Sequence, residues 1–378
     1  TNNLAKTACI NIVTLNSVAF YIFIMSASLP SSMRKLVVKT LTSNFRKAVE
    51  IQTVPLPNPA SGHVLVKNHF VGINASDVNF SAGKYDPSKQ PPFDAGFEAI
   101  GEVVAVGDGV SQSFIGKSVA HLSNGAFSEF QAVAGKSILE IPSMQPQYIP
   151  CLVSGMTAKL ALQESGNLKP NEKVLVTAAS GGTGQFAVQL AKLAGCHVIG
   201  TCSSDKKVNF LKSIGCDHAI NISTENLGQV LKEHYPHGVD VVYESVGGET
   251  YETCVNRLAV KGRLIVIGYI SGYQQPMGVA TTTSARGAAA LPVKMLMKSS
   301  SVTGFFLFHY ANQWKSAFQE LSDLYVAGKL TCMVDDGSSE RKGGFRGIDD
   351  VTDAVDYLYS RKSVGKIVVN LASSGSKL

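Results

Sequence analysis

The chain has 378 residues, 45% of them hydrophobic and 16% charged, and a formal net charge of +6. This length is enough for two domains with a substantial core, and the composition excludes a disordered chain. The charge is a mild excess without a dense run of Lys and Arg, so it favours small anionic ligands, and we expect no nucleic-acid partner. The seven scattered cysteines form no C-x-x-C pair, which indicates buried thiols and not a disulfide framework.

The two ends of the chain carry different signals. Residues 8–25 form a mainly apolar stretch that approaches the length of a membrane span, but it contains several polar residues and lacks a basic region or cleavage site. We therefore interpret residues 1–32 as a leader and expect no stable membrane span. The last residues, Ser376-Lys377-Leu378, match the signal that the peroxisomal import receptor reads, so the sequence predicts a peroxisomal location.

The first part of the chain is typical of a β domain. Residues 63–73, 99–107 and 117–122 are rich in β-branched residues and are separated by Gly and Pro, which predicts short strands joined by tight turns. A helical stretch is expected around residues 148–166.

From Lys173 onward, short apolar strands alternate with helical segments. This alternation indicates a parallel sheet covered by helices on both faces, and six strands predict a doubly wound dinucleotide-binding domain of the Rossmann type. Small polar residues at 281–290 predict a loop. The predicted strands are residues 173–179, 197–203, 218–222, 239–245, 263–270 and 301–307.

After residue 309 a helix, an irregular stretch and a last strand at 366–371 indicate a return to the first domain. The fold class is therefore α/β. The predicted organisation is a β-rich catalytic domain at 33–154 and 309–372, an inserted nucleotide-binding domain at 155–308, and a flexible tail at 373–378.

A glycine-rich segment follows the first strand of the predicted nucleotide domain and precedes a helix. Its sequence, Ala179-Ser180-Gly181-Gly182-Thr183-Gly184, fits the G-x-G-x-x-G pattern with Ala in the first position. Gly181 would admit the pyrophosphate close to the backbone, and Gly184 would allow the helix to pack closely on the strand. The motif predicts binding of a dinucleotide.

The end of the second strand indicates which dinucleotide is bound. An NAD site usually carries an acidic residue there, whereas this chain has Ser203 and Lys207, which suit the 2′-phosphate of NADPH. Asp205 is expected to cap the next helix. Lys207 is also compatible with a solvated position on that helix.

Four motifs give the chain a family resemblance. AASGGTGQFAVQLAK (178–192), GVDVVYESVGG (238–248), GRLIVIG (262–268) and VGKIVV (364–369) resemble the quinone-oxidoreductase-like branch of the medium-chain dehydrogenase/reductase superfamily. The resemblance covers residues 33–378 and implies a GroES-like catalytic domain. Within this branch the chain looks most like members that use NADPH to reduce the double bond of 15-keto-prostaglandins, giving 13,14-dihydro-15-keto-prostaglandins.

The resemblance does not extend to a zinc site. Zinc-dependent relatives take ligands from a Cys after an early Gly turn and from a Gly-His-Glu segment, where this chain has Asn74 and Phe97-Glu98. Amide and phenyl groups do not replace thiolate and imidazole as zinc ligands. We therefore expect no metal.

The same resemblance implies a set of cofactor-contacting positions. One position departs from the family, because Ile222 stands where a Tyr often packs beside the adenosine phosphate. The implied positions are Thr183, Ser203, Lys207, Ser245, Ile267, Tyr273, Phe305, Phe306, Leu307 and Ser363.

Two tyrosines are candidate catalytic residues. Conjugate reduction places negative charge on the carbonyl oxygen, so the site needs hydrogen-bond donors. Tyr273 follows the fifth strand and could donate to that oxygen or brace the ribose, and Tyr85 resembles the proton-donor tyrosine of enoyl reductases. We assign Asn74 and Glu98 structural roles.

Two functions other than enone reduction are compatible with the sequence, a quinone reductase and a non-catalytic NADPH-binding regulator. The sixth strand of the nucleotide domain could pair with that of a second chain to form a homodimer.

Overall fold

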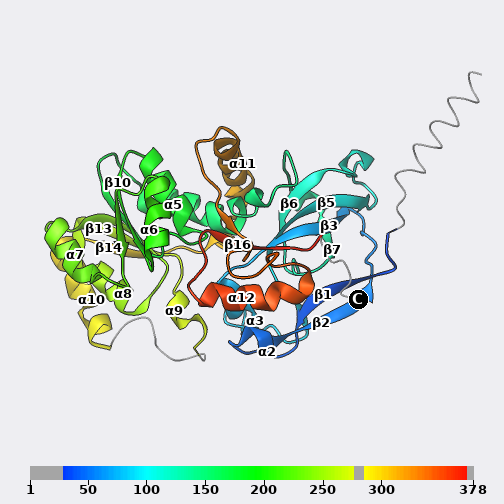
Figure 1. The fold of residues 1–378 in the computed structure, drawn as a ribbon, viewed down its shortest axis with the longest axis horizontal. Coiled ribbons are helices and arrows are strands. Elements are labelled where there is room, and N and C mark those ends of the chain that lie inside the picture. The colour runs from blue at the N-terminus through cyan, green and yellow to red at the C-terminus, as the bar shows by residue number, and fades with distance from the viewer. Residues whose placement is uncertain (1–28, 276–284, 373–378) are drawn as a thin grey trace, which may run out of the picture.

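The computed structural model describes residues 29–275 and 285–372, which form two lobes (Figure 1). The apolar stretch at 8–25 and the terminal Ser376-Lys377-Leu378 lie outside the described residues. In Figure 1 the blue N-terminal strands and the red C-terminal helix share one lobe, and the green and yellow elements form the other. Within the described ranges, every helix is too short or too polar to traverse a lipid bilayer.

The first lobe is built mainly from strands, as predicted. A seven-stranded sheet has the order β15-β16-β3-β5-β6-β8, with β7 paired to β3, and a smaller sheet has the order β2-β1-β4. Branched side chains such as Val64, Val66 and Val119 alternate into the core between the curled strands. The strands are β1 (Ser32–Val38), β2 (Val49–Pro55), β3 (His63–Gly72), β4 (Phe93–Asp94), β5 (Glu98–Val106), β6 (Ser118–Leu122), β7 (Phe130–Ala134) and β8 (Ile138–Glu140). The helices are α2 (Phe45–Ala48), α3 (Ser76–Ser81), η1 (Gln112–Phe114), η2 (Gly135–Ser137) and η3 (Pro146–Tyr148).

The second lobe confirms the doubly wound fold. Its six strands are all parallel and lie in the order β11-β10-β9-β12-β13-β14, in which the crossover after the third strand creates a switch point between β9 and β12. The strands are β9 (Lys173–Val176), β10 (His197–Cys202), β11 (His218–Asn221), β12 (Val239–Glu244), β13 (Leu258–Val266) and β14 (Ser301–Gly304). The helices are α5 (Gly184–Leu193), α6 (Asp205–Ser213), α7 (Leu227–His234), α8 (Gly248–Asn256), α9 (Ile270–Tyr273) and α10 (Ala285–Lys298).

Helices cover both faces of this sheet. Successive residues of a strand point to opposite faces, so each strand contributes side chains to both of the helical layers. Val174 and Val176 of β9 pack under α5 and α6, while Leu175 packs with side chains of α7 and α8.

The predicted loop at 281–290 is wrong over its second half, since α10 already begins at Ala285. Alanines follow at 288–290, and their high helix propensity outweighs the small size on which the loop prediction rested.

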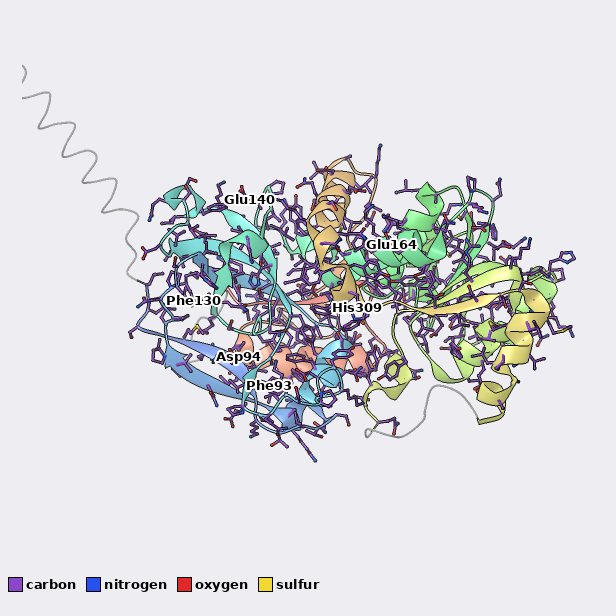
Figure 2. All side chains as sticks on the ribbon, turned by 180° about the vertical axis from the view of Figure 1, so that it is seen from behind. Phe93, Asp94, Phe130, Glu140, Glu164 and His309 are labelled. Carbon is purple, nitrogen blue, oxygen red and sulfur yellow. The ribbon has the colours of Figure 1, made fainter. Side chains whose placement is uncertain are left out.

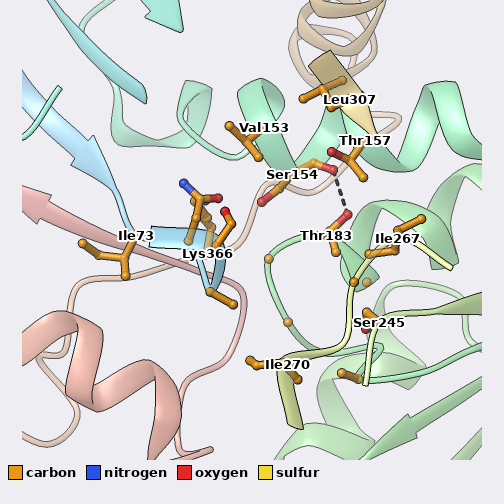
Figure 3. Close-up of a pocket in the computed structure, with 18 of the residues that line it drawn as sticks. Ile73, Val153, Ser154, Thr157, Thr183, Ser245, Ile267, Ile270, Leu307 and Lys366 are labelled. Atoms are coloured by element: carbon orange, nitrogen blue, oxygen red, sulfur yellow. Dashed lines mark hydrogen bonds between the residues drawn. The ribbon is translucent and has the colours of Figure 1, made fainter. Parts of the chain in front are cut away.

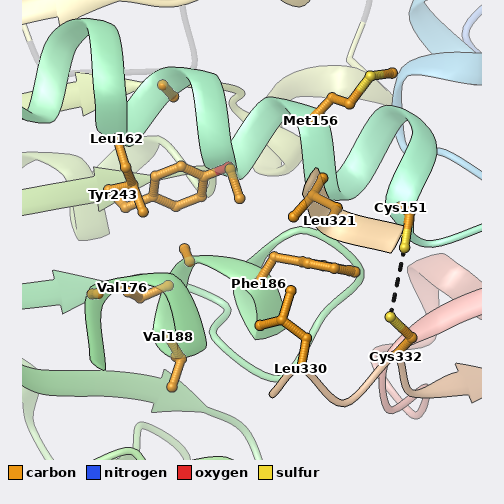
Figure 4. Packing of buried hydrophobic residues seen from close by; sticks show 14 of the residues in the cluster. Cys151, Met156, Leu162, Val176, Phe186, Val188, Tyr243, Leu321, Leu330 and Cys332 are labelled. Carbon is orange, nitrogen blue, oxygen red and sulfur yellow. Dashed lines mark hydrogen bonds between the residues drawn. The ribbon is translucent and has the colours of Figure 1, made fainter. Parts of the chain in front are cut away.

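A helical connection joins the lobes. The predicted helix at 148–166 is a helical stretch with a kink at Leu152, where ψ is −116°, and its last turn is widened to π-helix. Its parts are η4 (Cys151–Gly155), α4 (Met156–Ala161) and η5 (Leu162–Gly166). Phe186 and Leu321 pack beneath it (Figure 4). The same core holds the thiols of Cys151 and Cys332, whose sulfur atoms lie 3.6 Å apart. All six described cysteines are buried free thiols.

The end of the chain returns to the first lobe. Strand β16 pairs antiparallel with β3, and the residue before it, Gly365, donates its N–H to the carbonyl oxygen of Ser180 at 2.8 Å. Side chains fill both lobes, and His309 lies where they meet (Figure 2). The elements of this part are η6 (Leu307–Gln313), α11 (Trp314–Val326), β15 (Val334–Asp335), η7 (Ile348–Asp350), α12 (Val351–Tyr359) and β16 (Lys366–Asn370).

Candidate active site

A cavity of about 220 Å³ lies between the two lobes, at the carboxyl ends of the parallel strands (Figure 3). This is the edge at which doubly wound sheets bind their ligands. Apolar side chains make up most of its wall. The predicted site residues that line it are Tyr85, Gly181, Gly182, Thr183, Gly184, Ser245, Ile267, Tyr273, Phe305, Phe306 and Leu307.

The glycine-rich loop is shaped by close backbone contacts. A Cβ atom on Gly184 would lie 2.5 Å from the carbonyl oxygen of Ala178, so only glycine lets α5 begin at this point. Gly181 lines the cavity, and a Cβ atom there would lie 3.2 Å from the carbonyl oxygen of Ala178, a tight contact that glycine avoids. Ala179 does not line the cavity. It is fully buried, and its N–H donates to Thr201, which ties the loop to β10. The N-terminus of α5 therefore faces the cavity, as a phosphate site requires.

Thr183 is fixed from two sides. Its hydroxyl donates to the carbonyl oxygen of Ser154 at 2.9 Å. Because a hydroxyl has a single hydrogen, the Tyr243 hydroxyl, 2.7 Å away, must be the donor in the second hydrogen bond and Thr183 the acceptor. Tyr243 is fully buried. The side chain of Thr183 thus links the phosphate loop to the helical connection between the lobes, and Figure 3 shows the contact with Ser154.

Ser203 and Lys207 lie away from the cavity and contact one another. The ammonium group of Lys207 donates to Ser203 Oγ at 3.2 Å and to the carbonyl oxygen of Arg361 at 2.6 Å. Lys207 is buried, so the interpretation as a solvated helix residue is wrong. Burial lowers the pKa of Lys207, and the neighbouring charges of Arg361 and Lys206 lower it further. Three cations therefore gather at this end of β10, and Arg361 is a member that the sequence did not single out.

Two further positions that were predicted to contact the cofactor, Ile222 and Ser363, do not line the cavity. Ile222 is 41% exposed, and Ser363 is buried outside the cavity lining. Asp205 does not cap α6 as predicted, because the helix begins at Asp205 itself and the carboxylate accepts from Asn221 at 2.9 Å. This contact keeps Asp205 occupied by a protein donor.

The two candidate tyrosines meet across the cavity although they come from different lobes. Tyr85 and Tyr273 both line the cavity, Asn79 donates to the Tyr85 hydroxyl at 3.4 Å, and the backbone N–H of Tyr269 donates to the Tyr273 hydroxyl at 3.3 Å. Burial raises the pKa of Tyr273 well above its ordinary value. Tyr273 therefore remains a protonated donor throughout the physiological pH range.

A polar cluster of Asn74, Glu98 and Lys366 also reaches the cavity, although the sequence indicated only structural roles for Asn74 and Glu98 and none for Lys366. Lys366 Nζ lies 2.5 Å from Glu98 Oε1 and donates to Asn74 Oδ1 at 2.7 Å, and Asn74 Nδ2 donates to the same Glu98 oxygen at 2.9 Å. The second oxygen of Glu98 accepts from the backbone N–H of Val153. These three side chains, hereafter the Asn–Glu–Lys ring, are almost completely buried, and Asn74 and Lys366 line the cavity. The sequence feature that could have indicated this site is Lys366, a charged residue at the start of the otherwise apolar strand β16.

The donor set does not fit zinc. The positions that would supply a thiolate and an imidazole hold Asn74 and Phe97, and the Glu98 carboxylate is already paired with an ammonium group, which repels a second cation. Across the described part of the chain, no three His, Cys, Asp or Glu side chains are grouped so as to hold a metal ion.

The inserted Rossmann domain, the curled β domain and the cavity between them define a medium-chain oxidoreductase. Residues 182–323 match the family described as zinc-binding dehydrogenase, and residues 60–143 match the alcohol dehydrogenase GroES-like domain. The chain belongs to the quinone-oxidoreductase-like branch of the medium-chain dehydrogenase/reductase superfamily.

Individual relatives place the chain more closely. It is 51% identical over 370 residues to prostaglandin reductase-3 of Bos taurus, with 97% of both chains covered. It is 42% identical to a probable quinone oxidoreductase of Leishmania amazonensis, covering 91% of this chain and 99% of the relative. The structure of Escherichia coli quinone oxidoreductase complexed with NADPH superposes with a TM-score of 0.75 at 25% identity, covering 89% of this chain and all of that one.

Proposed function

We propose that the protein is a zinc-independent, NADPH-dependent reductase of the carbon–carbon double bond in α,β-unsaturated ketones, with 15-keto-prostaglandins as substrates. The observation that carries the proposal is the cavity itself, where the phosphate loop, an apolar wall and hydrogen-bond donors converge without a metal-ligand set. The similarity to prostaglandin reductase-3 supports the choice of substrate class.

The chain's residues fit NADPH at both ends of the expected binding path. The phosphate loop offers the N-terminus of α5 to the pyrophosphate. The cations Lys206, Lys207 and Arg361 suit the additional phosphate of NADPH, while Asp205 is held by Asn221. When bound, NADPH supplies the hydride. Ser245 and Ile267, which follow β12 and β13 at their carboxyl ends and line the cavity, would contact its reactive ring.

The protein residues provide orientation and charge stabilisation for the substrate. Phe305, Phe306, Leu307 and Phe97 give an apolar surface that excludes water and suits the hydrocarbon chain of a lipid enone. Hydrogen-bond donors in the cavity stabilise the oxygen that gains negative charge, and each such donor is worth about 3 kcal/mol in the transition state.

Turnover of purified protein with a 15-keto-prostaglandin tests the proposal, with NADH and a simple quinone measured in parallel. We expect NADPH oxidation with the enone, a preference over NADH, and no loss of rate after chelator treatment. Quinone turnover without enone turnover would instead favour a quinone reductase, the second candidate, which the similarity to named quinone oxidoreductases supports. Tight NADPH binding without any turnover would favour a non-catalytic regulator.

Location and assembly are further parts of the proposal. The terminal Ser376-Lys377-Leu378 supports recognition by the peroxisomal import receptor. A fluorescent fusion that keeps this end free should enter peroxisomes, and a version that lacks the three residues should not.

Strand β14 lies at the edge of its sheet with exposed residues, which supports a homodimer formed by pairing of two such edges. Light scattering of the purified protein would measure the mass.

A further inference from the structure

The Asn–Glu–Lys ring fixes the orientation of the Asn74 amide. A lysine ammonium group can only donate, so it selects the Oδ1 atom of Asn74, and a carboxylate accepts, so Glu98 selects the Nδ2 atom. The backbone of Asn74 is also held, because its N–H donates to Asp77 Oδ2 at 2.7 Å. The amide therefore has one defined orientation at the cavity wall.

This arrangement leaves one N–H of the Asn74 amide without a protein acceptor in the described part of the chain. An amide nitrogen carries two hydrogens, and only one of them is used by Glu98. Asn74 lines the cavity and is 7% exposed, whereas Glu98 is completely buried. The remaining N–H is thus available to a ligand inside the cavity.

The charge of Lys366 strengthens this donor. A cation bound to the amide oxygen withdraws electron density from the nitrogen, and hydrogen bonds in a low-dielectric site reinforce one another in this way. The stem of Lys366 lies against the phosphate loop, since a Cβ on Gly182 would lie 3.2 Å from Lys366 Cδ. The ring and the cofactor loop are therefore parts of one site.

We propose that the free N–H of Asn74 binds the carbonyl oxygen of the enone, and that Lys366 is a positioning residue that orients and polarises this amide. The inference rests on the proposed function and deepens it. In the reaction a C–H bond forms at the β-carbon with the hydride from NADPH, the π bond shifts between the α-carbon and the carbonyl carbon, and the carbonyl electron pair moves to the oxygen. NADPH leaves as NADP⁺, and Asn74 stabilises the enolate oxygen until a proton from solvent water adds to the α-carbon and restores the ketone.

Replacement of Asn74 by Asp tests the donor with little change of shape. The variant keeps an oxygen for Lys366 but has no N–H for the cavity or for Glu98. Asn74→Asp/Glu98→Gln is therefore measured beside it, because the new amide can donate to Asp at position 74 and avoids a pair of buried carboxylates. We expect kcat to fall by about 100-fold while KM and NADPH affinity change by less than about threefold. Asn68→Asp is the matched control, because Asn68 is also buried in the same lobe but lies outside the cavity lining. Equal kcat values in Asn74→Asp and wild type would overturn the inference.

Variants of Lys366 test the positioning role. Lys366→Met should lower kcat by about tenfold, and Lys366→Arg, which keeps the charge and the donors, should recover most of that loss. Since Lys366→Met leaves Glu98 buried without its partner, the double variant Lys366→Met/Glu98→Gln keeps the test available if the single variant does not fold. A Lys366→Arg variant as slow as Lys366→Met would contradict a role that depends on charge.

The carbonyl stretching frequency of a bound ketone separates this inference from the proposed function. The probe is the saturated 13,14-dihydro-15-keto-prostaglandin, labelled with ¹³C at the ketone and bound with NADP⁺. We expect the band at a lower frequency in wild type than in Asn74→Asp. Identical bands, or no binding of the ketone, would overturn the inference. A lowered band in a wild-type protein that does not reduce the enone would support the donor and overturn the proposed function alone.

Discussion

The ammonium group of Lys84 donates to the main-chain carbonyl oxygen of Tyr273 at 2.7 Å and to that of Gln275 at 2.9 Å. Lys84 belongs to the first lobe, in the loop after α3, whereas Tyr273 ends α9 in the nucleotide lobe. Ser43 adds a second link by donating to the carbonyl oxygen of Gln274 at 3.0 Å. These contacts hold the segment that carries Tyr273 against the lobe that carries Tyr85.

Loss of the Lys84 contact should loosen this side of the cavity. We expect Lys84→Met to raise KM for the enone several-fold, because the segment that carries Tyr273 would no longer be held against the lobe that carries Tyr85. Lys67→Met is a suitable control, since Lys67 is exposed on β3. Steady-state kinetics measure the effect, and an unchanged KM would show that the other contacts of the segment suffice.

Gly184→Ala should weaken NADPH binding by at least about tenfold. The added methyl group would lie 2.5 Å from the carbonyl oxygen of Ala178, so the phosphate loop must move. Gly228→Ala is the matched control, because its methyl group would meet no atom closer than 3.4 Å within α7, where alanine favours the helix. Fluorescence titration with NADPH measures both affinities. Equal affinities would show that close packing at Gly184 is not required.

Tyr243→Phe should lower the free energy of unfolding by about 1–2 kcal/mol, since it removes a buried hydrogen bond to Thr183. NADPH binding should weaken as well, because Thr183 lies in the phosphate loop. Tyr325→Phe removes a hydroxyl whose bond to Gln145 is exposed and should have a smaller effect on stability. Urea unfolding compares the two variants, and equal losses would contradict the role of burial.

Asp77 should make stability decrease with rising pH. Burial raises the pKa of Asp77 from 3.8 to about 8, although the Asn74 backbone N–H and Lys366 act in the opposite direction. Between these two values the folded protein retains a proton that the unfolded chain has released, so the free energy of unfolding falls as pH rises from about 4 to 8. Asp77→Asn keeps the contact to Asn74 without the titration. Its stability relative to wild type should therefore increase over this range, and parallel pH profiles would contradict the assignment.

The general architecture was predictable because periodicity and glycine spacing are local properties of the sequence. The six apolar runs from Lys173 onward became β9 to β14, and the segment around Gly181 became the cavity-facing loop. Strand ends were less accurate. The run at 301–307, for example, pairs only as far as Gly304, because Phe305, Phe306 and Leu307 leave the sheet to line the cavity.

The Asn–Glu–Lys ring could not be predicted in the same way. Asn74 and Lys366 are 292 residues apart, so no local pattern links them, and each has an ordinary explanation when read alone. Asn74 suits a turn, and a lysine at the start of a strand is usually solvated. Only the return of β16 beside β3 shows that the two side chains share one buried site.

That long separation also dictates an order of folding. The nucleotide lobe contains its strands and helices in one continuous stretch, so it can collapse while the rest of the chain is still being made. The ring closes only when Asn74 and Lys366, which are 292 residues apart, have come together, so its loop-closure cost is high. A partly synthesised chain could thus acquire its nucleotide-binding lobe before it is able to use a reductant, and competence for reduction would appear last.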